Sequence, residues 1–264
     1  MNLNLTLPDY AYETIIKFIR DFTLGKGVVV GLSGGLDSSV VLALCVHAIG
    51  PEKVIAVHMP DSITPSIESE HAKIIAEKYG VDMRIINIEP AVRELKKISG
   101  VSSLNAVANL KARTRMTILY SIANENSLLV AGTSNKSELL TGYFTKYGDG
   151  ASDFAPIGDL YKTQVRLLAR EIGIPEEIIR KKPSANLLPD QYDEDELGVK
   201  YEILDRILYG IELNIDIRKI QNILGVNERV IRRVYALYES SKHKRVLLYI
   251  PKLGIRTVNT DWRE

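Results

Sequence analysis

Four short runs of apolar, largely β-branched residues divide the first half of the chain, and segments of helical periodicity separate them. The runs are Val28–Gly31, Val54–His58, Arg84–Ile88 and Leu128–Gly132. Such short runs, bounded by glycine, proline or polar residues, are typical of strands buried in a parallel sheet. The helical segments are Ser38–Ile49, Ser66–Tyr79 and Leu104–Ala123. This alternation predicts an α/β fold, a doubly wound parallel sheet flanked by helices, with ligands at the carboxyl ends of the strands.

The composition favours an ordinary globular protein with a substantial core. The chain has 264 residues, of which 45% are hydrophobic and 25% charged, and its formal net charge is +1. This balance gives no general attraction for nucleic acid or for a membrane surface, and we expect neither as a partner. The single cysteine, Cys45, excludes an intramolecular disulfide and a cysteine-clustered metal site, and its apolar surroundings predict a buried thiol.

The N-terminal sequence lacks the basic flank and apolar run of a signal peptide, so we expect a cytoplasmic protein. After Gly132 the chain becomes polar and glycine-rich, a helix is predicted near Tyr161–Ile172, and further helical segments continue to about Lys242. No internal repeat or low-complexity linker separates the halves. We therefore predict one domain over residues 1–264, with a nucleotide-binding core in 1–135 and a substrate-binding, helical elaboration in 136–264.

A glycine-rich loop directly follows the first strand and opens a helix. Its sequence is Gly31-Leu32-Ser33-Gly34-Gly35-Leu36-Asp37-Ser38. Adjacent glycines permit a tight turn, and free N–H groups at a helix start bind anions. The carboxylate of Asp37 fits an anion site only if a divalent cation joins it to the phosphates. The loop lacks the Gly-Lys-Ser/Thr of kinase-type phosphate loops and the G-x-G-x-x-G dinucleotide fingerprint. A simple glycine turn with a helix cap remains the alternative.

The SGGLDS stretch of this loop resembles the pyrophosphate loop of the N-type ATP pyrophosphatases, which cleave ATP to AMP and pyrophosphate. Four later segments resemble the NAD+ synthetases within that superfamily. They are Asn109–Met116 (NLKARTRM), Ala131–Asp153 (AGTSNKSELLTGYFTKYGDGASD), Pro183–Tyr201 (PSANLLPDQYDEDELGVKY) and Ser241–Arg245 (SKHKR). Together with the loop they span most of the chain. The resemblance implies a Rossmann-like adenine nucleotide alpha hydrolase architecture.

The resemblance also implies specific site residues. The ATP site would comprise Gly31, Leu32, Ser33, Gly34, Gly35, Leu36, Asp37, Ser38, Thr133, Lys162 and Ser184. Asp37 and Glu138 would bind Mg²⁺, as two carboxylates that converge on triphosphate oxygens. Deamido-NAD+ would contact Arg113, Lys146, Asp153, His243 and Lys244. Ser184 stands at a position where the family often has threonine, and serine retains the hydroxyl group. The acidic run Asp190–Glu196 would belong to a segment that orders over bound substrate.

By this resemblance the chain is a ligase that forms NAD+ from deamido-NAD+, ATP and ammonia through an acyl adenylate. Asp37 and Lys162 would act on the phosphates, and Asp153 is the candidate general base from its position alone. Glutamine-dependent members carry an additional amidase domain, for which this length leaves no room, so free ammonia is the expected nitrogen source. The resemblance further implies a homodimer.

Three alternatives remain open from the sequence. The first is another ATP pyrophosphatase, such as a GMP synthetase-type or tRNA-modifying enzyme. The second is a nucleic-acid-binding module, because Asp216–Tyr238 reads as two helices joined by a glycine turn, with basic residues on the second helix. The third is a nucleotide sensor without catalytic activity, against which both proposed metal carboxylates and Lys162 argue.

Overall fold

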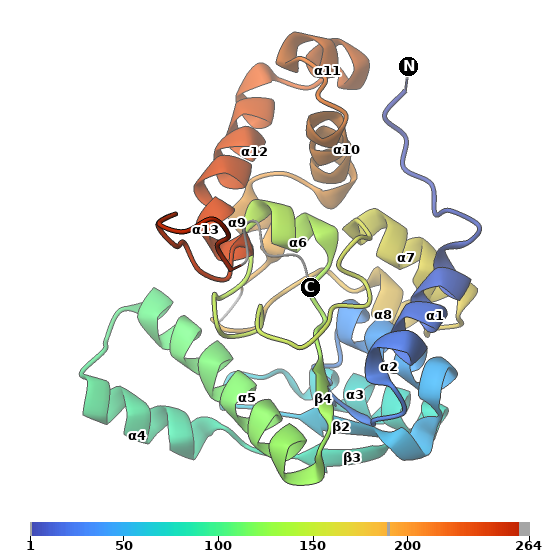
Figure 1. Ribbon diagram of the computed structural model, residues 1–264, viewed down its shortest axis with the longest axis vertical. Helices are drawn as coiled ribbons and strands as arrows, with labels where there is room; N and C mark the ends of the chain where they lie inside the picture. The colour runs from blue at the N-terminus through green and yellow to red at the C-terminus, as the bar shows by residue number, and fades with distance from the viewer. Residues whose placement is uncertain (1, 189–190, 259–264) are drawn as a thin grey trace.

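A parallel sheet forms the centre of the molecule, of which the computed structural model describes residues 2–188 and 191–258. Its strands are β1 (Val28–Gly31), β2 (Val54–His58), β3 (Asp82–Ile85) and β4 (Leu129–Ala131), in the order β3-β2-β1-β4 (Figure 1). The chain moves outward from β1 through β2 to β3 and then returns to place β4 on the other side of β1. This reversal creates a switch point at the carboxyl ends of β1 and β4. The predicted fold class is confirmed.

Helices cover both faces of the sheet. One face carries α1 (Ala11–Thr23), α2 (Leu36–Ile49), α3 (Ser66–Tyr79), α7 (Lys162–Glu171) and α8 (Glu176–Arg180), and a 3₁₀ turn at Pro51–Lys53 follows α2. The other face carries α4 (Glu89–Ser99) and α5 (Leu104–Asn126). The central helix α2 is apolar on nearly all sides because it packs between the sheet, α1 and α7. The phosphate loop is therefore anchored at both ends in the largest core.

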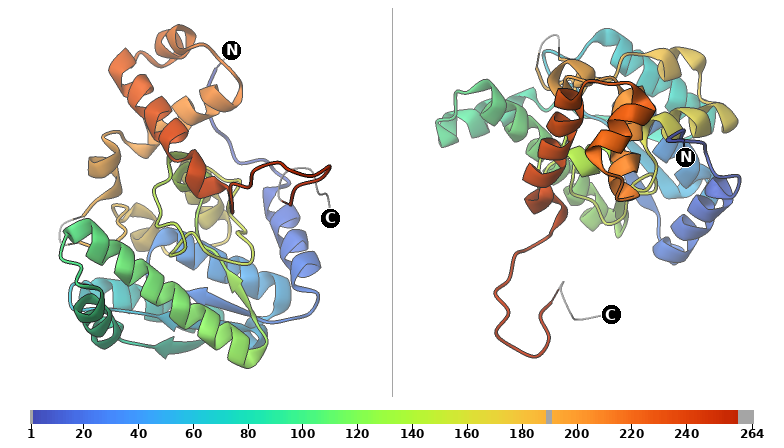
Figure 2. Two further views of the ribbon diagram at one scale, coloured as in Figure 1. Left: turned by 60° about the vertical axis from the view of Figure 1, so that its left-hand side comes forward. Right: turned by 90° about the horizontal axis from the view of Figure 1, so that it is seen from above.

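A third layer of helices lies over the carboxyl edge of the sheet (Figures 1 and 2). It consists of α6 (Lys136–Thr141), α9 (Asp193–Leu197), α10 (Tyr201–Glu212), α11 (Ile217–Leu224), α12 (Glu228–Ser240) and α13 (Lys242–Arg245). The N-terminal segment belongs to this layer, since Leu3 is fully buried among residues of α10 to α12. The Nε of Arg206 also donates to the Leu3 carbonyl at 3.3 Å. The space between this layer and the sheet is where a ligand can bind.

Several predicted boundaries need correction. The third strand is Asp82–Ile85 instead of Arg84–Ile88, and it is an exposed edge strand instead of a buried one. Its register is fixed by β2, where Ile55 pairs with Asp82, and the last paired position is Ile85 with His58. Cys45 is buried as predicted, and burial raises the pKa of its thiol to about 12. Within the described residues, no helix combines the length and the apolar character needed to cross a bilayer.

Asp205 on α10 bonds to α6 within the third layer and to α7, which packs against the sheet. Its carboxylate accepts hydrogen bonds from the Ser137 hydroxyl on α6, at 2.5 Å, and from the Thr163 backbone N–H on α7, at 2.8 Å. Ser137 in turn accepts a hydrogen bond from the Lys162 N–H at 2.9 Å. The carboxylate is fully buried, and burial raises its pKa from 3.8 to about 6. Asp205 therefore holds the start of α7 through its carboxylate. Burial disfavours the charged form of that carboxylate.

The raised pKa of Asp205 predicts a measurable dependence of stability on pH. The native state holds this proton more tightly than the unfolded chain, so the contribution is present below pH 3.8 and is lost as pH rises through about 6. An Asp205→Asn variant removes the titration. Its unfolding free energy relative to the original chain should rise by about 2 kcal/mol between about pH 4.5 and pH 7.5. Urea unfolding at both pH values measures this difference, and parallel pH profiles for the two proteins would contradict it.

Candidate active site

The phosphate loop runs from β1 into α2 and is held by its own hydroxyl groups. The Ser33 N–H donates to the Ser38 hydroxyl at 3.2 Å, and the two hydroxyls lie 3.0 Å apart. The Gly35 N–H donates to the Ser33 hydroxyl at 3.1 Å. Behind the loop, Nδ1 of the buried His58 lies 2.9 Å from the Leu32 carbonyl. These internal hydrogen bonds stabilise the curved shape of the loop, as an anion site of this kind requires.

Gly34 is the position in the loop where only glycine fits. Its φ is +83°, and a Cβ built there would lie 2.1 Å from the backbone carbonyl oxygen of Glu68 at the start of α3. Positive φ alone is unfavourable for a side chain, and contact with backbone atoms leaves no flexible group to move aside. α3 can therefore approach the phosphate loop this closely only because Gly34 has no side chain.

A pair of glycine substitutions separates these two effects. Gly25 has the same φ of +83°, but a Cβ there meets nothing within 4 Å. Both Gly34→Ala and Gly25→Ala carry the conformational strain, whereas Gly34→Ala also displaces α3. We expect Gly34→Ala to lower the unfolding free energy by about 1–3 kcal/mol more than Gly25→Ala, measured by urea denaturation. Equal losses would show that the loop yields without moving α3.

Lys162, the first residue of α7, lies between two carboxylates of the candidate site. Its Nζ forms an ion pair with Asp37 Oδ2 and lies 3.8 Å from Glu138 Oε1. The side chain is only 4% exposed. Burial acts to lower the pKa of Lys162, but Asp37, Glu138 and Asp193 outweigh it and raise that pKa. A permanent positive charge is therefore fixed beside the phosphate loop.

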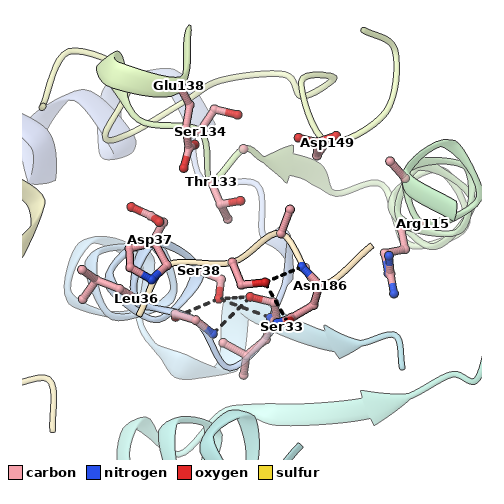
Figure 3. Close-up of a pocket in the computed structure, with 18 of the residues that line it drawn as sticks. Ser33, Leu36, Asp37, Ser38, Arg115, Thr133, Ser134, Glu138, Asp149 and Asn186 are labelled. Carbon is pink, nitrogen blue, oxygen red and sulfur yellow. Dashed lines mark hydrogen bonds between the residues drawn. The ribbon is translucent and has the colours of Figure 1, made fainter. Parts of the chain in front are cut away.

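Glu138 has a second role as part of the helix cap of α6. Its Oε2 accepts from the Asn135 N–H at 3.2 Å, and its own N–H donates to Asn135 Oδ1 at 3.0 Å, which completes a capping box. The Asn135 amide also donates to Asp37 Oδ1 at 3.2 Å. Burial, together with the nearby charge of Asp37, raises the pKa of Glu138 well above its usual value. In Figure 3 both carboxylates lie on the same side of the pocket.

These two acids fit a magnesium site that is completed by a nucleotide. Burial raises the pKa of Glu138 most, and the charge of Asp37 raises it further; a divalent cation would relieve the repulsion between the two acids. Among the described residues, no three His, Cys, Asp or Glu side chains are grouped closely enough to hold a metal by themselves. Mg²⁺ usually binds one or two carboxylates and takes its remaining ligands from phosphates and water. The residues present therefore match the chemistry of Mg²⁺ with ATP.

The sequence did not single out Asp193, which lies in the acidic run and is the first residue of α9. Asp190, at the start of that run, is outside the described residues. Asp193 is 4% exposed, and its Oδ2 accepts from the Tyr201 hydroxyl at 3.1 Å. Its Oδ1 is buried with no hydrogen-bond partner among the described residues. Burial raises the pKa of Asp193. A buried carboxylate beside Lys162 is not what an acidic surface run predicts.

One pocket at the carboxyl edge of the sheet gathers most of the residues predicted to bind ATP and magnesium. Those that line it are Gly31, Leu32, Ser33, Gly35, Leu36, Asp37, Ser38, Thr133, Glu138, Lys162 and Ser184. Gly34 is not among the lining residues, and its carbonyl accepts a hydrogen bond from Lys181 Nζ at 2.7 Å. The pocket is also lined by Arg115, Asp149 and Asp193, which are not among the residues predicted for the ATP site. The predicted nucleotide residues therefore lie together.

The residues predicted to bind deamido-NAD+ do not line this pocket. Three of them form a separate chain of contacts, in which Arg113 donates to the Lys146 carbonyl at 3.3 Å and Lys146 Nζ donates to the His243 carbonyl at 2.8 Å. Lys244 Nζ donates to the carbonyls of Gly142 and Phe144, at 2.7 and 2.6 Å. These side chains connect α5, the loop after α6 and α13. They form a second, more exposed surface.

The predicted general base, Asp153, is engaged with the sheet. Its Oδ2 accepts from the Val130 N–H at 2.7 Å and its Oδ1 from the Tyr120 hydroxyl at 3.3 Å. Asp149, four residues earlier, lines the pocket instead, and burial raises the pKa of its carboxyl group. The sequence could not separate these acids because both flank the same glycine turn.

Comparisons with known proteins identify the family to which the chain is similar. The family model described as NAD synthase matches residues 11–247. A similar protein from Hyperthermus butylicus, an NH(3)-dependent NAD(+) synthetase, is 47% identical over 251 residues, which cover 91% of each chain. Among solved structures, an NMN synthetase from Francisella tularensis is similar with 31% identity and a TM-score of 0.83, covering 95% of this chain and 100% of the other. An NH3-dependent NAD synthetase from Campylobacter jejuni shows 30% identity and a TM-score of 0.78, covering 96% and 100%.

The fold and the loop define an α/β nucleotide-binding protein whose phosphate loop faces a buried lysine and two carboxylates. The similar proteins identify one family within that class. The chain belongs to the NAD synthase family. The family prediction is therefore confirmed, and membership of the GMP synthetase-type or tRNA-modifying enzymes is not favoured.

Proposed function

We propose that this protein forms NAD+ from deamido-NAD+, ATP and ammonia, and releases AMP and pyrophosphate. The observation that carries the proposal is the meeting of Asp37, Glu138 and Lys162 in one pocket beside the phosphate loop. This arrangement suits the transfer of an adenylyl group, in which charge on the leaving pyrophosphate must be neutralised. Family membership and a relative named as an NH(3)-dependent NAD(+) synthetase support the choice of acceptor and of nitrogen donor.

In the first step the nicotinate carboxylate attacks the α-phosphorus of ATP. We assign Asp37 and Glu138 to hold Mg²⁺, which supplies charge neutralisation on the phosphates when it is bound. The N–H groups of the loop bind phosphate oxygens, and Lys162 offsets the negative charge that develops during displacement. Thr133 and Ser184 line the same pocket and provide hydroxyl groups for the nucleotide. The adenylate forms, and pyrophosphate leaves with its charge neutralised.

In the second step ammonia attacks the acyl carbonyl and AMP departs. A proton acceptor for the ammonium ion must reach this carbonyl. Asp153, the candidate from sequence, has both carboxylate oxygens in hydrogen bonds with β4 and α5. Asp149 lines the pocket, and its Oδ1 accepts a hydrogen bond from the Thr145 N–H at 3.0 Å. We therefore assign proton acceptance to Asp149 and a supporting role under the substrate surface to Asp153.

The substrate dinucleotide is assigned to the surface formed by Arg113, Lys146, His243 and Lys244, together with Asp153. Cationic and hydrogen-bonding groups of this kind suit its pyrophosphate and ribose. We also propose a cytoplasmic homodimer. Exposed apolar side chains such as Phe18 and Phe22 on α1 support an interface between subunits. Light scattering of the purified protein determines whether the dimer exists.

A product assay tests the reaction. Purified protein with ATP, Mg²⁺, ¹⁵N-ammonium and deamido-NAD+ should give equal amounts of labelled NAD+, AMP and pyrophosphate. Nicotinate mononucleotide offered in parallel tests the acceptor, because one structural neighbour is an NMN synthetase. Preferred amidation of the mononucleotide would reassign the substrate. Robust turnover with glutamine and none with ammonium would reverse the assignment of the nitrogen source.

A further inference from the structure

Lys181 lies between the phosphate loop and α3, in the segment that follows α8. Its Nζ donates to the Gly34 carbonyl at 2.7 Å, approaches His71 Nδ1 at 3.3 Å and forms an ion pair with Glu68. A lysine ammonium has three N–H donors, and the Gly34 carbonyl and the Glu68 carboxylate accept two of them. Although Lys181 lies in the pocket wall, its side chain is only 22% exposed. Its charge is directed to protein groups and not to the open pocket.

Glu68 links Lys181 to a second part of the pocket. Its side chain is 7% exposed, and its Oε1 accepts from the Asn186 amide at 3.1 Å. The Asn186 N–H in turn donates to the Ser184 hydroxyl at 3.0 Å. The backbone carbonyl of Glu68 also packs against Gly34. One buried carboxylate on α3 therefore holds both the phosphate loop and the turn that carries Ser184.

We propose that the Lys181–Glu68 ion pair positions the phosphate loop for ATP. The peptide bond between Gly34 and Gly35 is planar, so fixing its carbonyl on Lys181 directs the Gly35 N–H to the opposite side. That N–H meets the Ser33 hydroxyl at 3.1 Å, and both residues line the pocket. Lys181 acts through the Gly34 carbonyl and is a positioning residue. The inference rests on the proposed function, because it takes the pocket to be the ATP site.

A double-mutant cycle distinguishes positioning from direct phosphate binding. The variants are Lys181→Met, Glu68→Gln and the combination, and the readout is the Kd for ATP with Mg²⁺ by calorimetry, without deamido-NAD+. If the pair works as a unit, each single variant weakens ATP binding by about tenfold and the double variant is no worse than Lys181→Met. Lys181→Arg should recover part of the loss. The KM for ammonium should stay unchanged in all variants that fold.

A matched cycle on the same helix provides the control. Lys73 and Glu77 form an exposed ion pair on α3, with Nζ 3.7 Å from Oε1 and side chains 69% and 66% exposed. Lys73→Met, Glu77→Gln and their combination should leave the ATP affinity unchanged within about twofold. Glu68→Gln is close in shape to the original side chain, so it tests the inference even if Lys181→Met does not fold.

Three results would overturn the inference. Tighter ATP binding in Glu68→Gln would show that Lys181, once released, binds phosphate directly. Additive losses in the double variant would show that the two residues act independently. A lower Tm with an unchanged Kd for ATP would leave the pair a purely structural role. If the unaltered protein does not bind ATP, the proposed function itself fails, which is a separate outcome because it appears before any variant is compared.

Discussion

Replacing Lys162 by methionine should lower kcat by about a thousandfold. Methionine keeps most of the length of the side chain and removes the charge that Asp37 and Glu138 share. The negative charge that develops during displacement then loses the lysine that offsets it beside the phosphate loop. The variant should also lose about 3 kcal/mol of unfolding free energy, because buried carboxylates are left unpaired. Steady-state kinetics at saturating ATP and urea unfolding measure the two effects.

Lys136 offers a matched control for this substitution. It begins α6 as Lys162 begins α7, and its Nζ lies 2.9 Å from Asp159 Oδ1 and 3.0 Å from Glu212. Its side chain is 18% exposed, and it does not line the pocket. Lys136→Met also removes a lysine from two carboxylates, yet kcat should stay within about threefold of the original value. If the Lys162→Met variant kept more than a tenth of the original kcat, Lys162 would have no role in the chemical step.

Glu138→Gln should lower the activity without lowering the stability of the ligand-free protein. Glutamine keeps an oxygen that can accept from the Asn135 N–H, so the helix cap survives while the charge is lost. Without that charge the site holds Mg²⁺ less well, and kcat should fall by about a hundredfold with a higher Mg²⁺ requirement. Because burial raises the pKa of Glu138, its charged form disfavours folding near neutral pH. The ligand-free variant should therefore be at least as stable as the original.

The measurements for Glu138→Gln are a Mg²⁺ titration of the rate and a thermal melt at about pH 7.5 without nucleotide. Glu212→Gln is the control, since Glu212 is half-exposed and pairs with Lys136 outside the pocket. A variant that lost stability along with activity would mean that Glu138 acts mainly as a structural carboxylate. An unchanged Mg²⁺ requirement would exclude it as a metal ligand.

The sequence predicts those parts of this molecule whose pattern is local. The bounds of β1 and β2 are correct because both strands lie in the centre of the sheet, where burial on both faces produces a continuous apolar run. The edge strand β3 has no such run, and its position is set by pairing with β2. The pairing of Asp37 with Glu138 comes from the family resemblance. The structure supplies a physical reason for it, since the two residues follow the neighbouring strands β1 and β4.

The parts that could not be predicted depend on contacts between distant segments. Glu68 and Lys181 are 113 residues apart, and neither lies in a sequence motif that predicts the other as its partner. Asp193 is one acid in a run of several, and only the packing of α9 against Tyr201 determines which of them is buried. Asp149 and Asp153 share one turn, and the sheet decides which of them bonds to β4. Such choices are made by tertiary packing, which the local pattern does not contain.

The burial of the N-terminal segment constrains the order in which the protein can be completed during synthesis. Leu3 has its apolar partners on α10 to α12, and the Thr6 carbonyl accepts from Gln164 at 2.8 Å. A ribosome produces these partners late, so the first residues to emerge must wait for most of the polypeptide before they are covered. The sheet can assemble while translation continues. Leu3 can therefore be buried only after α10 to α12 have been synthesised.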